Sequence, residues 1–347
     1  MPGPPPAVAQ VRIAVRAALS PLAADSLVLA AVSGGADSLA LLAATAFEAP
    51  RRRLRIGLIT VDHGLQAGSA ERAAELARWA RSRGIDPAEA IAVDVGTSGG
   101  PEGAARAARY DALTAAADRH HAAAILLGHT REDQAETVLL ALARGSGARA
   151  LSGMRARRGR FLRPLLSVRR DVVRAAAAVD PFLAGRVPWA DPHNEDQAYA
   201  RVRVRAATAE LAELLGPGLV AGLARSSDLL RADADHLDAL AAAAAAENGV
   251  PDRLADGLDT AALGALAPAV RTRVLRLAAL AAGAPGGALS SAHVDALDAL
   301  VSRWHGQGPV SLPRGVRAER RHGRLSVFRS GDDLGGRQCT TATSKPS

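Results

Sequence analysis

The sequence is poor in several kinds of residue and segment, and each shortage excludes a class of protein. Cys339 is the only cysteine among 347 residues, so one chain can form no disulfide, no Cys-ligated zinc site and no CxxC redox pair. No run of about 18 strongly apolar residues occurs, which predicts no transmembrane helix. The start, MPGPPPAVAQ, lacks the basic and apolar regions of a signal peptide. Cytoplasmic residence is therefore the expectation.

Lysine and aromatic residues are also scarce. Lys345 is the only lysine, although lysine and arginine together number 43 and the net charge is +8. A GC-rich genome favours arginine codons but does not explain the positive balance, which suggests a polyanionic partner. Aromatic residues make up 3% of the chain. Stacking on nucleic-acid bases would therefore fall to a few side chains, such as Trp189, Tyr199 or Trp304, or to arginine planes.

Hydrophobic patterning predicts two domains. Strands expected at 26–32, 54–61, 89–95 and 123–128 alternate with helices expected at 37–48, 69–83, 101–120 and 132–143. Such repeats form a parallel sheet with helices on both faces. Residues 167–179 look helical, the stretch up to 205 is polar and irregular, 219–248 is the longest helix, and 309–328 alternates like a small β element.

The expected fold class is α/β, a parallel-sheet domain followed by a mainly helical domain with a small β element. We place the domains at 1–206 and 207–330, and a disordered tail at 331–347.

Polar and small residues gather where the expected strands end. They are SGGADS after Val32, DHGLQ after Val61, GTSGGPEG after Val95 and HTREDQAE after Gly128. Open parallel sheets bind ligands at the carboxyl ends of their strands, so these segments predict one site.

The loop SGGADS has two interpretations. Gly34 and Gly35 allow close approach of the backbone to a ligand, and the following helix N-terminus offers free N–H groups to an anion. Ser33 and Ser38 add hydroxyl groups. The loop lacks the lysine of a kinase-type phosphate loop and the GxGxxG pattern of dinucleotide-binding folds. The alternative is a plain strand–helix turn capped by Asp37 or Ser38.

A strand, SGGxDS and an apolar helix in this order resemble the PP-loop ATP pyrophosphatases, which release pyrophosphate after adenylating a substrate. The resemblance implies that ATP binds to Ser33, Gly34, Gly35, Ala36, Asp37 and Ser38. An aspartate in such a loop does not contact phosphate directly, because like charges repel. Asp37 is therefore expected to hold Mg²⁺, which neutralises charge on the leaving pyrophosphate.

Further motifs narrow the resemblance, over about residues 26–205, to the tRNA(Ile)-lysidine synthetase family. They are VDHGLQAGS, EGAARAARYDAL, LLGHTREDQAETVLLALARGSG, RPLL and ADPHNEDQAYARVRVR. The family uses ATP to adenylate the wobble cytidine of the isoleucine tRNA with a CAU anticodon, and lysine then displaces AMP. The implied cofactors and partners are ATP, Mg²⁺, L-lysine and this tRNA. No membrane partner is expected, and the oligomeric state stays open, with a homodimer as one option.

The resemblance and the strand-end positions together nominate further site residues. His63 follows the second strand, where the base or ribose of a nucleotide would lie, and Gly128 ends the fourth. A lone histidine at a strand end is more often structural. Arg109 shares a helix face with Arg106, which is either a solvated basic surface or a contact with phosphate or the leaving AMP.

The helix after the fourth strand carries the remaining catalytic candidates, His129, Asp133 and Glu136. A helix beginning after Thr130 puts both carboxylates on one face, and Thr130 with Asp133 resembles a capping box. Capping does not exclude a further role, and these carboxylates could also hold a metal or attract the ammonium of lysine. Zinc binding by His129 lacks support, because no cysteine or second histidine lies nearby.

Arginine clusters indicate where RNA would bind. The family's motif often ends in an RNR-type sequence, whereas here Arg201, Arg203 and Arg205 alternate with valine. The resemblance assigns these three to RNA binding, although a helix would turn Arg203 away from the other two. Basic clusters at 154–174 and 305–329 flank an acidic stretch at 228–259. A charge run is usually a solvated face, but this arrangement fits a folded RNA held at two points.

Two other functions compete. Another PP-loop enzyme, such as a tRNA thiolase, generally needs a cysteine pair or cluster for sulfur transfer, which Cys339 alone does not provide. A non-catalytic RNA-binding relative would have a decayed ATP site, whereas SGGADS and HTREDQAE are intact.

Overall fold

The computed structural model describes residues 3–64, 66–96, 100–145, 147–191, 196–198, 200–252, 254 and 256–329. Contacts within the chain divide it into two compact units, Met1–Arg231 and Ala232–Ser347. Tyr199, Cys339 and the expected tail at 331–347 lie outside the described residues.

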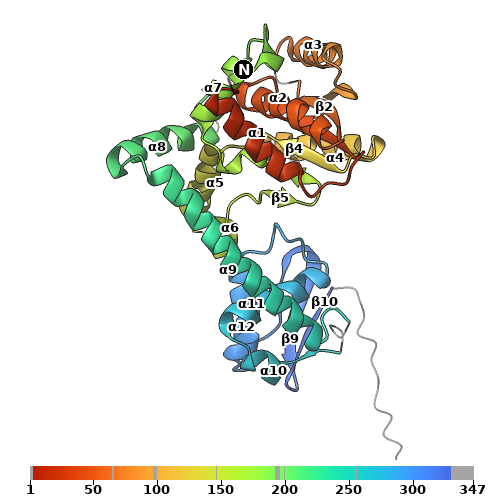
Figure 1. The fold of residues 1–347 in the computed structure, drawn as a ribbon. Helices are drawn as coiled ribbons and strands as arrows, with labels where there is room; N and C mark the ends of the chain where they lie inside the picture. Colours follow the sequence, from red (N-terminus) through yellow and green to blue (C-terminus); the bar gives the residue numbers. More distant parts are fainter. Residues whose placement is uncertain are drawn as a thin grey trace, which may run out of the picture. The chain divides into compact units, whose positions relative to one another are not determined.

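A mostly parallel sheet forms the centre of the first unit (Figure 1). Its strands are β1 (Leu27–Ala31), β2 (Arg55–Asp62), β3 (Ala88–Ala92), β4 (Ala124–Leu127), β5 (Arg157–Arg158) and β6 (Phe161–Leu162). They lie in the order β3-β2-β1-β4-β6-β5, and every neighbouring pair is parallel except β5 with β6. The parallel sheet is therefore confirmed, and the short hairpin β5–β6 extends it beyond the prediction.

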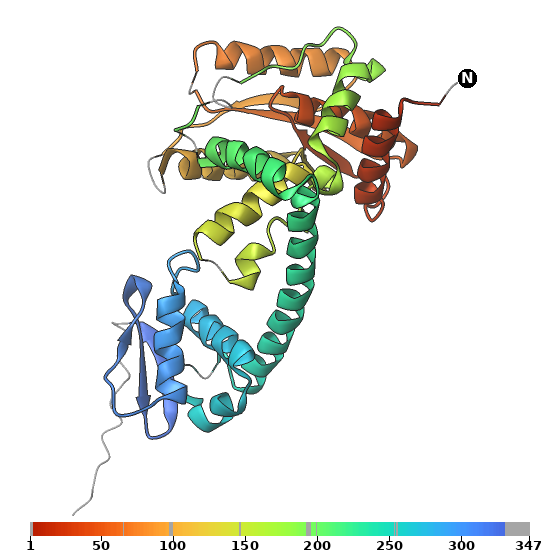
Figure 2. The same cartoon turned by 90° about the vertical axis from the view of Figure 1, so that its left-hand side faces the viewer.

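Helices cover both faces of this sheet (Figure 2). They include α1 (Pro6–Leu19), α2 (Ala36–Arg51), α3 (Ser69–Ser82), α4 (Gly100–Arg119), α5 (Arg131–Ala143), α6 (Ala148–Leu151) and α7 (Arg170–Val179), with 3-10 turns η1 (Pro164–Ser167) and η2 (Pro181–Leu183). Successive strand residues point to opposite faces. Val28 and Ala30 of β1 thus pack with α1, α2 and α7, while Leu27 and Leu29 pack with α4.

The boundary of the first unit lies later than the sequence predicts. Helix α8 (Ala200–Leu215) runs through the expected boundary at 206/207 and includes part of the stretch expected to be irregular. Helix α9 (Leu219–Glu247) begins within the first unit. The amide of Gln134 donates to the Ser227 hydroxyl at 3.0 Å, and Arg231 donates to the Met154 carbonyl at 2.9 Å. These bonds tie the start of α9 to the sheet domain.

The second unit combines helices with a small antiparallel sheet, as predicted. Its further helices are α10 (Thr260–Ala265), α11 (Pro268–Ala281) and α12 (Ser291–Ser302), and η4 (Pro313–Gly315) is a 3-10 turn. The strands β7 (Leu258–Asp259), β8 (Val310–Ser311), β9 (Val316–Arg321) and β10 (Arg324–Arg329) lie in the order β7-β10-β9-β8. Leu275, Leu297, Val316 and Leu325 belong to its fully buried core.

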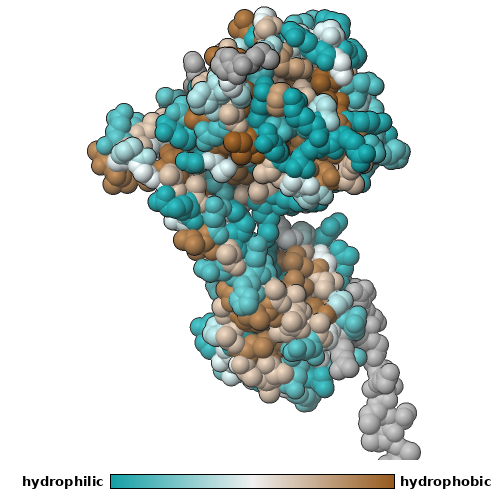
Figure 3. Space-filling view, viewed as in Figure 1, coloured by the Kyte–Doolittle hydropathy of each residue, from teal (hydrophilic) through white to brown (hydrophobic). Residues whose placement is uncertain are grey.

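Among the helices of the described residues, length and hydropathy decide which could span a membrane. No single helix is long and apolar enough, and α8 with α9 meets both criteria only as a pair that bends by 106°. Leu214 and Leu215, at the end of α8, are 81% and 70% exposed. Figure 3 shows apolar surface at this end of the helix, at the far left of the view.

The end of β4 lies directly against the first turn of α2. A Cβ atom on Gly128 would lie 3.2 Å from the carbonyl oxygen of Asp37 and 3.3 Å from the Cα atom of Ser38. Both neighbours are backbone atoms, which cannot rotate away as a side chain can. A side chain at position 128 would therefore press on the first turn of α2, and glycine allows this close approach without displacing the loop.

Gly128→Ala is expected to lower the free energy of unfolding of the first unit by about 1–3 kcal/mol, because the added methyl group overpacks this contact. Gly103→Ala is the matched control, since Gly103 lies inside α4 with open space around it. Alanine should stabilise that helix by about 0.5–1 kcal/mol. Urea unfolding followed by circular dichroism measures both changes, and an unchanged midpoint for Gly128→Ala contradicts the packing role.

Candidate nucleotide and RNA site

The loop after β1 is closed by its own hydroxyl groups. The Ser38 hydroxyl accepts a hydrogen bond from the Ser33 N–H at 3.2 Å and donates to the Gly35 carbonyl at 2.9 Å. Gly34 has a φ of +87°, a conformation that strains any other residue. Gly35 is the N-cap of α2 and has no side chain to cap it. The backbone N–H groups in the first turn of α2 therefore remain available to bind an anion.

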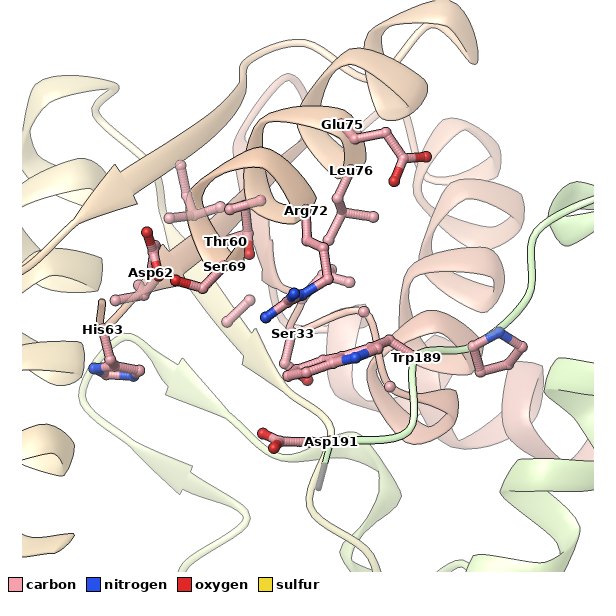
Figure 4. A pocket seen from close by; sticks show the side chains of 18 of the residues that line it. Ser33, Thr60, Asp62, His63, Ser69, Arg72, Glu75, Leu76, Trp189 and Asp191 are labelled. Atoms are coloured by element: carbon pink, nitrogen blue, oxygen red, sulfur yellow. The ribbon is translucent and has the colours of Figure 1, made fainter. Parts of the chain in front are cut away.

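A pocket of about 910 Å³ lies beside this loop, at the carboxyl ends of β1 and β2 (Figure 4). The Trp189 N–H donates to the Gly34 carbonyl at 3.0 Å, so the segment 185–191 crosses over the loop. The Arg72 guanidinium lies over the Trp189 ring, 4.6 Å from its centroid. Gln66 donates to Asp191 at 2.6 Å. The volume suits a nucleotide, since small-molecule sites are typically about 300–1,000 Å³.

A smaller, basic pocket of about 160 Å³ lies beside the first. His63, Arg109, His129 and Arg201 line it together with Arg106, Tyr110, Ala105 and Leu127. His63 and Arg109 line both pockets. The structure thus brings together residues that the sequence nominated from four different segments, and Arg109 does not belong to an open, solvated helix face.

Both histidines of this pocket are held in their neutral form. Burial lowers the pKa of His63, and Arg109 lowers it further. Burial lowers the pKa of His129 to about 3, against the attraction of Asp133. The Nδ1 atoms of both rings are buried without a hydrogen-bond partner in the described part of the chain. Neutral rings with a free nitrogen suit hydrogen bonding to a substrate better than proton storage.

Three carboxylates face one arginine at the N-termini of α2, α5 and α7. Arg170 lies 2.7 Å from Asp133 Oδ1, 3.1 Å from Glu136 Oε1 and 3.8 Å from Asp37 Oδ2. Asp133 Oδ2 accepts the Thr130 N–H at 2.7 Å, and the predicted capping box is confirmed. Burial alone would raise the pKa of Asp133, but Arg170 and this N–H hold that pKa below its usual range.

Asp37 is the least completely paired of these carboxylates. Its Oδ1 atom is buried without a hydrogen-bond partner among the described residues. Burial raises the pKa of Asp37, and the neighbouring Asp133 raises it further against the pull of Arg170. One buried carboxylate oxygen without a donor is an observation that fits a cation brought in with a ligand. No group of three or more acidic, histidine or cysteine side chains able to hold a metal occurs among the described residues.

The arginines assigned to RNA binding take different places because residues 201–205 are helical. Arg201 lines the small basic pocket, and the Nε atom of Arg205 donates to Glu136 at 3.1 Å. Arg203 points elsewhere and donates to the carbonyls of Gln197 and Ala198. The expected separation of Arg203 from the other two is thus confirmed, and it follows from the 100° turn per helical residue.

Sequence reasoning missed three residues that complete the site. Arg163 opens the RPLL motif but the sequence assigns it no role, and both Arg163 and Arg170 stand among eight arginines within 154–174, where the pattern does not distinguish a buried arginine from a solvated one. Arg163 is 5% exposed and donates to the Tyr110 hydroxyl at 3.0 Å. The sequence predicts Trp189 only as a stacking candidate for RNA, whereas the structure places it on the 910 Å³ pocket.

Known proteins match both units of the chain. A family model described as a PP-loop domain matches residues 9–211, and one described as the TilS substrate binding domain matches residues 258–326. A solved U34-tRNA thiolase, NcsA of Methanococcus maripaludis with its 4Fe-4S cluster, aligns with a TM-score of 0.52 at 19% identity. The alignment covers 65% of this chain and 80% of that one, and it shows the fold alone.

Curated relatives are similar over nearly the whole length. The tRNA(Ile)-lysidine synthase of Thermobifida fusca is 58% identical, covering 94% of this chain and 99% of that protein. Those of Salinispora arenicola and Streptomyces coelicolor are 55% and 52% identical, covering 93% and 95% of this chain and 96% and 100% of those proteins.

The parallel sheet, the glycine loop at its carboxyl edge and the matched domain define a PP-loop protein. The similarity to these relatives extends over both units, which narrows the assignment from PP-loop proteins in general to one family. The chain belongs to the tRNA(Ile)-lysidine synthase family. The family that the sequence motifs resemble is thereby confirmed.

His129 makes the stability of the first unit depend on pH. Its folded pKa of about 3 lies below the unfolded value of about 6.5, so the unfolded chain binds the proton first. Its contribution is therefore present above about pH 6.5 and is lost as the pH falls towards 3. Between pH 7.5 and 5.5 the wild type is expected to lose about 1.4 kcal/mol through this group.

Urea unfolding of the wild type and of His129→Gln at these two pH values checks this expectation. The variant should lose less stability than the wild type on acidification, because it lacks the group that takes up the proton. Equal losses contradict the buried, neutral state of His129.

Proposed function

We propose that this chain is an ATP-dependent ligase that joins lysine to C2 of the wobble cytidine in the CAU-anticodon isoleucine tRNA. AMP, pyrophosphate and lysidine are the products. The strongest support is that the similarity to tRNA(Ile)-lysidine synthases extends over both units rather than over the PP-loop domain alone. Another PP-loop activity would account only for the first unit.

ATP is proposed to lie across the carboxyl ends of β1 and β2. Ser33, Gly34, Gly35, Ala36 and Ser38 would receive its phosphates at the N-terminus of α2. The base and ribose would occupy the 910 Å³ pocket towards His63. Gly128 contributes indirectly, because it lets β4 approach the first turn of α2.

Asp37 is proposed to hold Mg²⁺ together with phosphate oxygens. Its buried and unpartnered Oδ1 atom is the observation that supports this role. When bound, the ion would neutralise charge that develops on the departing pyrophosphate.

The small basic pocket is proposed to receive the cytosine and the leaving AMP. The O2 atom of the cytosine attacks the α-phosphorus, the bond to pyrophosphate breaks, and a deprotonated lysine amine then attacks C2 and expels AMP. Arg109 and Arg201 would stabilise the negative charge of the reacting phosphate. His129 would orient the base by hydrogen bonding, since its low pKa makes it a weak base.

Lysine is proposed to approach Asp133 and Glu136, whose negative charge attracts an ammonium group. Without ligands, both carboxylates form ion pairs with arginine. Arg170 pairs with Asp133 and with Glu136, and Arg205 also pairs with Glu136. The ammonium would therefore enter a site whose charge is already partly balanced.

Purified protein, ATP, radiolabelled lysine and tRNA(Ile) with a CAU anticodon test the activity. Asp37→Ala is expected to lower kcat for lysine incorporation by about 100-fold or more, because the metal-bound pyrophosphate loses its protein ligand. Asp118→Asn is the matched control, since this aspartate is 60% exposed on α4 and pairs with Arg160. It should stay within about twofold of the wild type.

The outcomes separate two claims. Lysine incorporation that persists in Asp37→Ala contradicts the proposed role of Asp37. If the wild type labels no tRNA, the proposed function itself fails.

The tRNA is proposed to contact a second groove of the first unit. This groove, of about 340 Å³, lies between α5, the 154–167 segment and the start of α9, and it is lined by Arg131, Arg163, Arg225, Arg231 and Asp228 among others. Strand β5 next to it carries Arg157 and Arg158, both of which are exposed. Arg163 connects the groove to the basic pocket through Tyr110. A positive groove leading to the reaction site suits an RNA backbone.

Replacing Arg158 and Arg225 by alanine is expected to weaken tRNA binding and to reduce the slope of log K against log salt concentration by about 1.4–1.8, for two lost phosphate contacts. Both side chains are exposed. The control removes Arg53 and Arg55, two exposed arginines at the amino end of β2, at the opposite edge of the sheet. Filter binding at several salt concentrations measures the slopes. Equal slopes for the two double variants contradict the groove.

A further inference from the structure

One buried arginine links the three helices that begin at the phosphate loop. Arg170 opens α7, Asp37 lies in the first turn of α2, and Asp133 and Glu136 lie on the first two turns of α5. The Arg170 side chain is only 12% exposed. Its backbone N–H also donates to Glu132 Oε2 at 2.8 Å, which fixes the start of α7 against α5.

The charge around Arg170 poses a problem for the binding of a nucleotide triphosphate. Asp37, Asp133 and Glu136 would by themselves place three negative charges beside the loop that is proposed to receive the phosphates. Arg205 also pairs with Glu136, at 3.1 Å, but Arg170 is the cation that faces Asp133 and Asp37 as well. Like charges in a partly buried site repel strongly, because little water screens them. A positive charge among these carboxylates therefore favours anion binding at the N-terminus of α2.

We propose that Arg170 is a positioning residue for the adenylation step. Its charge neutralises the cluster of Asp37, Asp133 and Glu136, so that ATP can bind beside these carboxylates. Its geometry leaves the Asp37 carboxylate able to face the phosphates. The proposal rests on the proposed use of ATP at this loop. Arg170 would act through the carboxylates and would not itself contact the reacting atoms.

The Arg170 guanidinium contacts the three carboxylates unequally. Its terminal nitrogens lie within hydrogen-bond distance of Asp133 and Glu136, at 2.7–3.2 Å. Its Nε atom stays 3.8 Å from Asp37, which is an ion-pair distance without a hydrogen bond. Asp133 and Glu136 are therefore occupied, while Asp37 is attracted but not held.

A purely structural role for Arg170 is the competing explanation. A buried ion pair that only joins helices would change stability when broken, without a specific effect on ATP affinity. Arg16 provides a comparison, because it donates to both oxygens of the buried Glu48, at 2.9 Å each, although its own side chain is 53% exposed. Glu48 lies on α2 as well, near its C-terminal end and far along the helix from the loop.

Equilibrium binding of ATP to the full chain, without tRNA, tests the proposal. Arg170→Gln is expected to weaken ATP binding by about tenfold or more, whereas Arg170→Lys, which keeps the charge, should stay within about threefold. Arg16→Gln should lower the thermal midpoint but leave ATP affinity within about twofold. Adding Glu136→Gln to Arg170→Gln should restore most of the lost affinity, because the excess negative charge is removed.

Three results overturn the proposal: Arg170→Gln binds ATP like the wild type, Arg170→Lys loses as much affinity as Arg170→Gln, or the double variant recovers nothing. If Arg170→Gln does not fold, Arg170→Lys and the double variant decide the question. The failure of the proposed function gives a different result, since a wild type that binds ATP but incorporates no lysine leaves the role of Arg170 intact.

Discussion

The contact between the end of β4 and the first turn of α2 is the constraint on which the site depends. Gly128 brings the two backbones together, and the next residues, His129 and Thr130, lead into α5. The N-termini of α2 and α5 are thereby held side by side, and their amide groups and acidic side chains converge. A bulkier residue at this position would separate the phosphate loop from the helix that carries Asp133.

Local patterns in the sequence were sufficient for the sheet and for the position of the site. Four apolar strands, the glycine loop and the capping box at Thr130 depend on neighbouring residues, so they can be read without the fold. The edge of the sheet then follows from chain topology. The same reasoning nominated His63, Arg109 and His129 from separate segments, and the structure places them around one small pocket.

Features that depend on distant pairing could not be predicted. Arg170 forms ion pairs with residues that are distant in the sequence, such as Asp133, whereas Arg169 pairs with the nearby Asp171. No local sequence pattern distinguishes the two arginines. Helix α1 is missing from the predicted elements although Val8, Val11, Val15 and Leu19 recur at helical spacing, so this omission is not due to distant pairing. The stretch up to residue 205 is expected to be irregular because it is polar, whereas α8 begins at Ala200. Its arginines contact Glu136 and line the basic pocket, which the local sequence does not indicate.

The arginines of the site have a chemical consequence beyond charge. Every strongly basic side chain between residues 3 and 329 is a guanidinium, since Lys345 is the only lysine of the chain. A guanidinium stays protonated at any pH that the enzyme meets and is a poor nucleophile. An activated cytidine formed among these residues would find no side-chain amine of the described structure within reach. The free amino acid would then meet no competing side-chain amine from residues 3–329, which limits the joining of this part of the chain to the RNA.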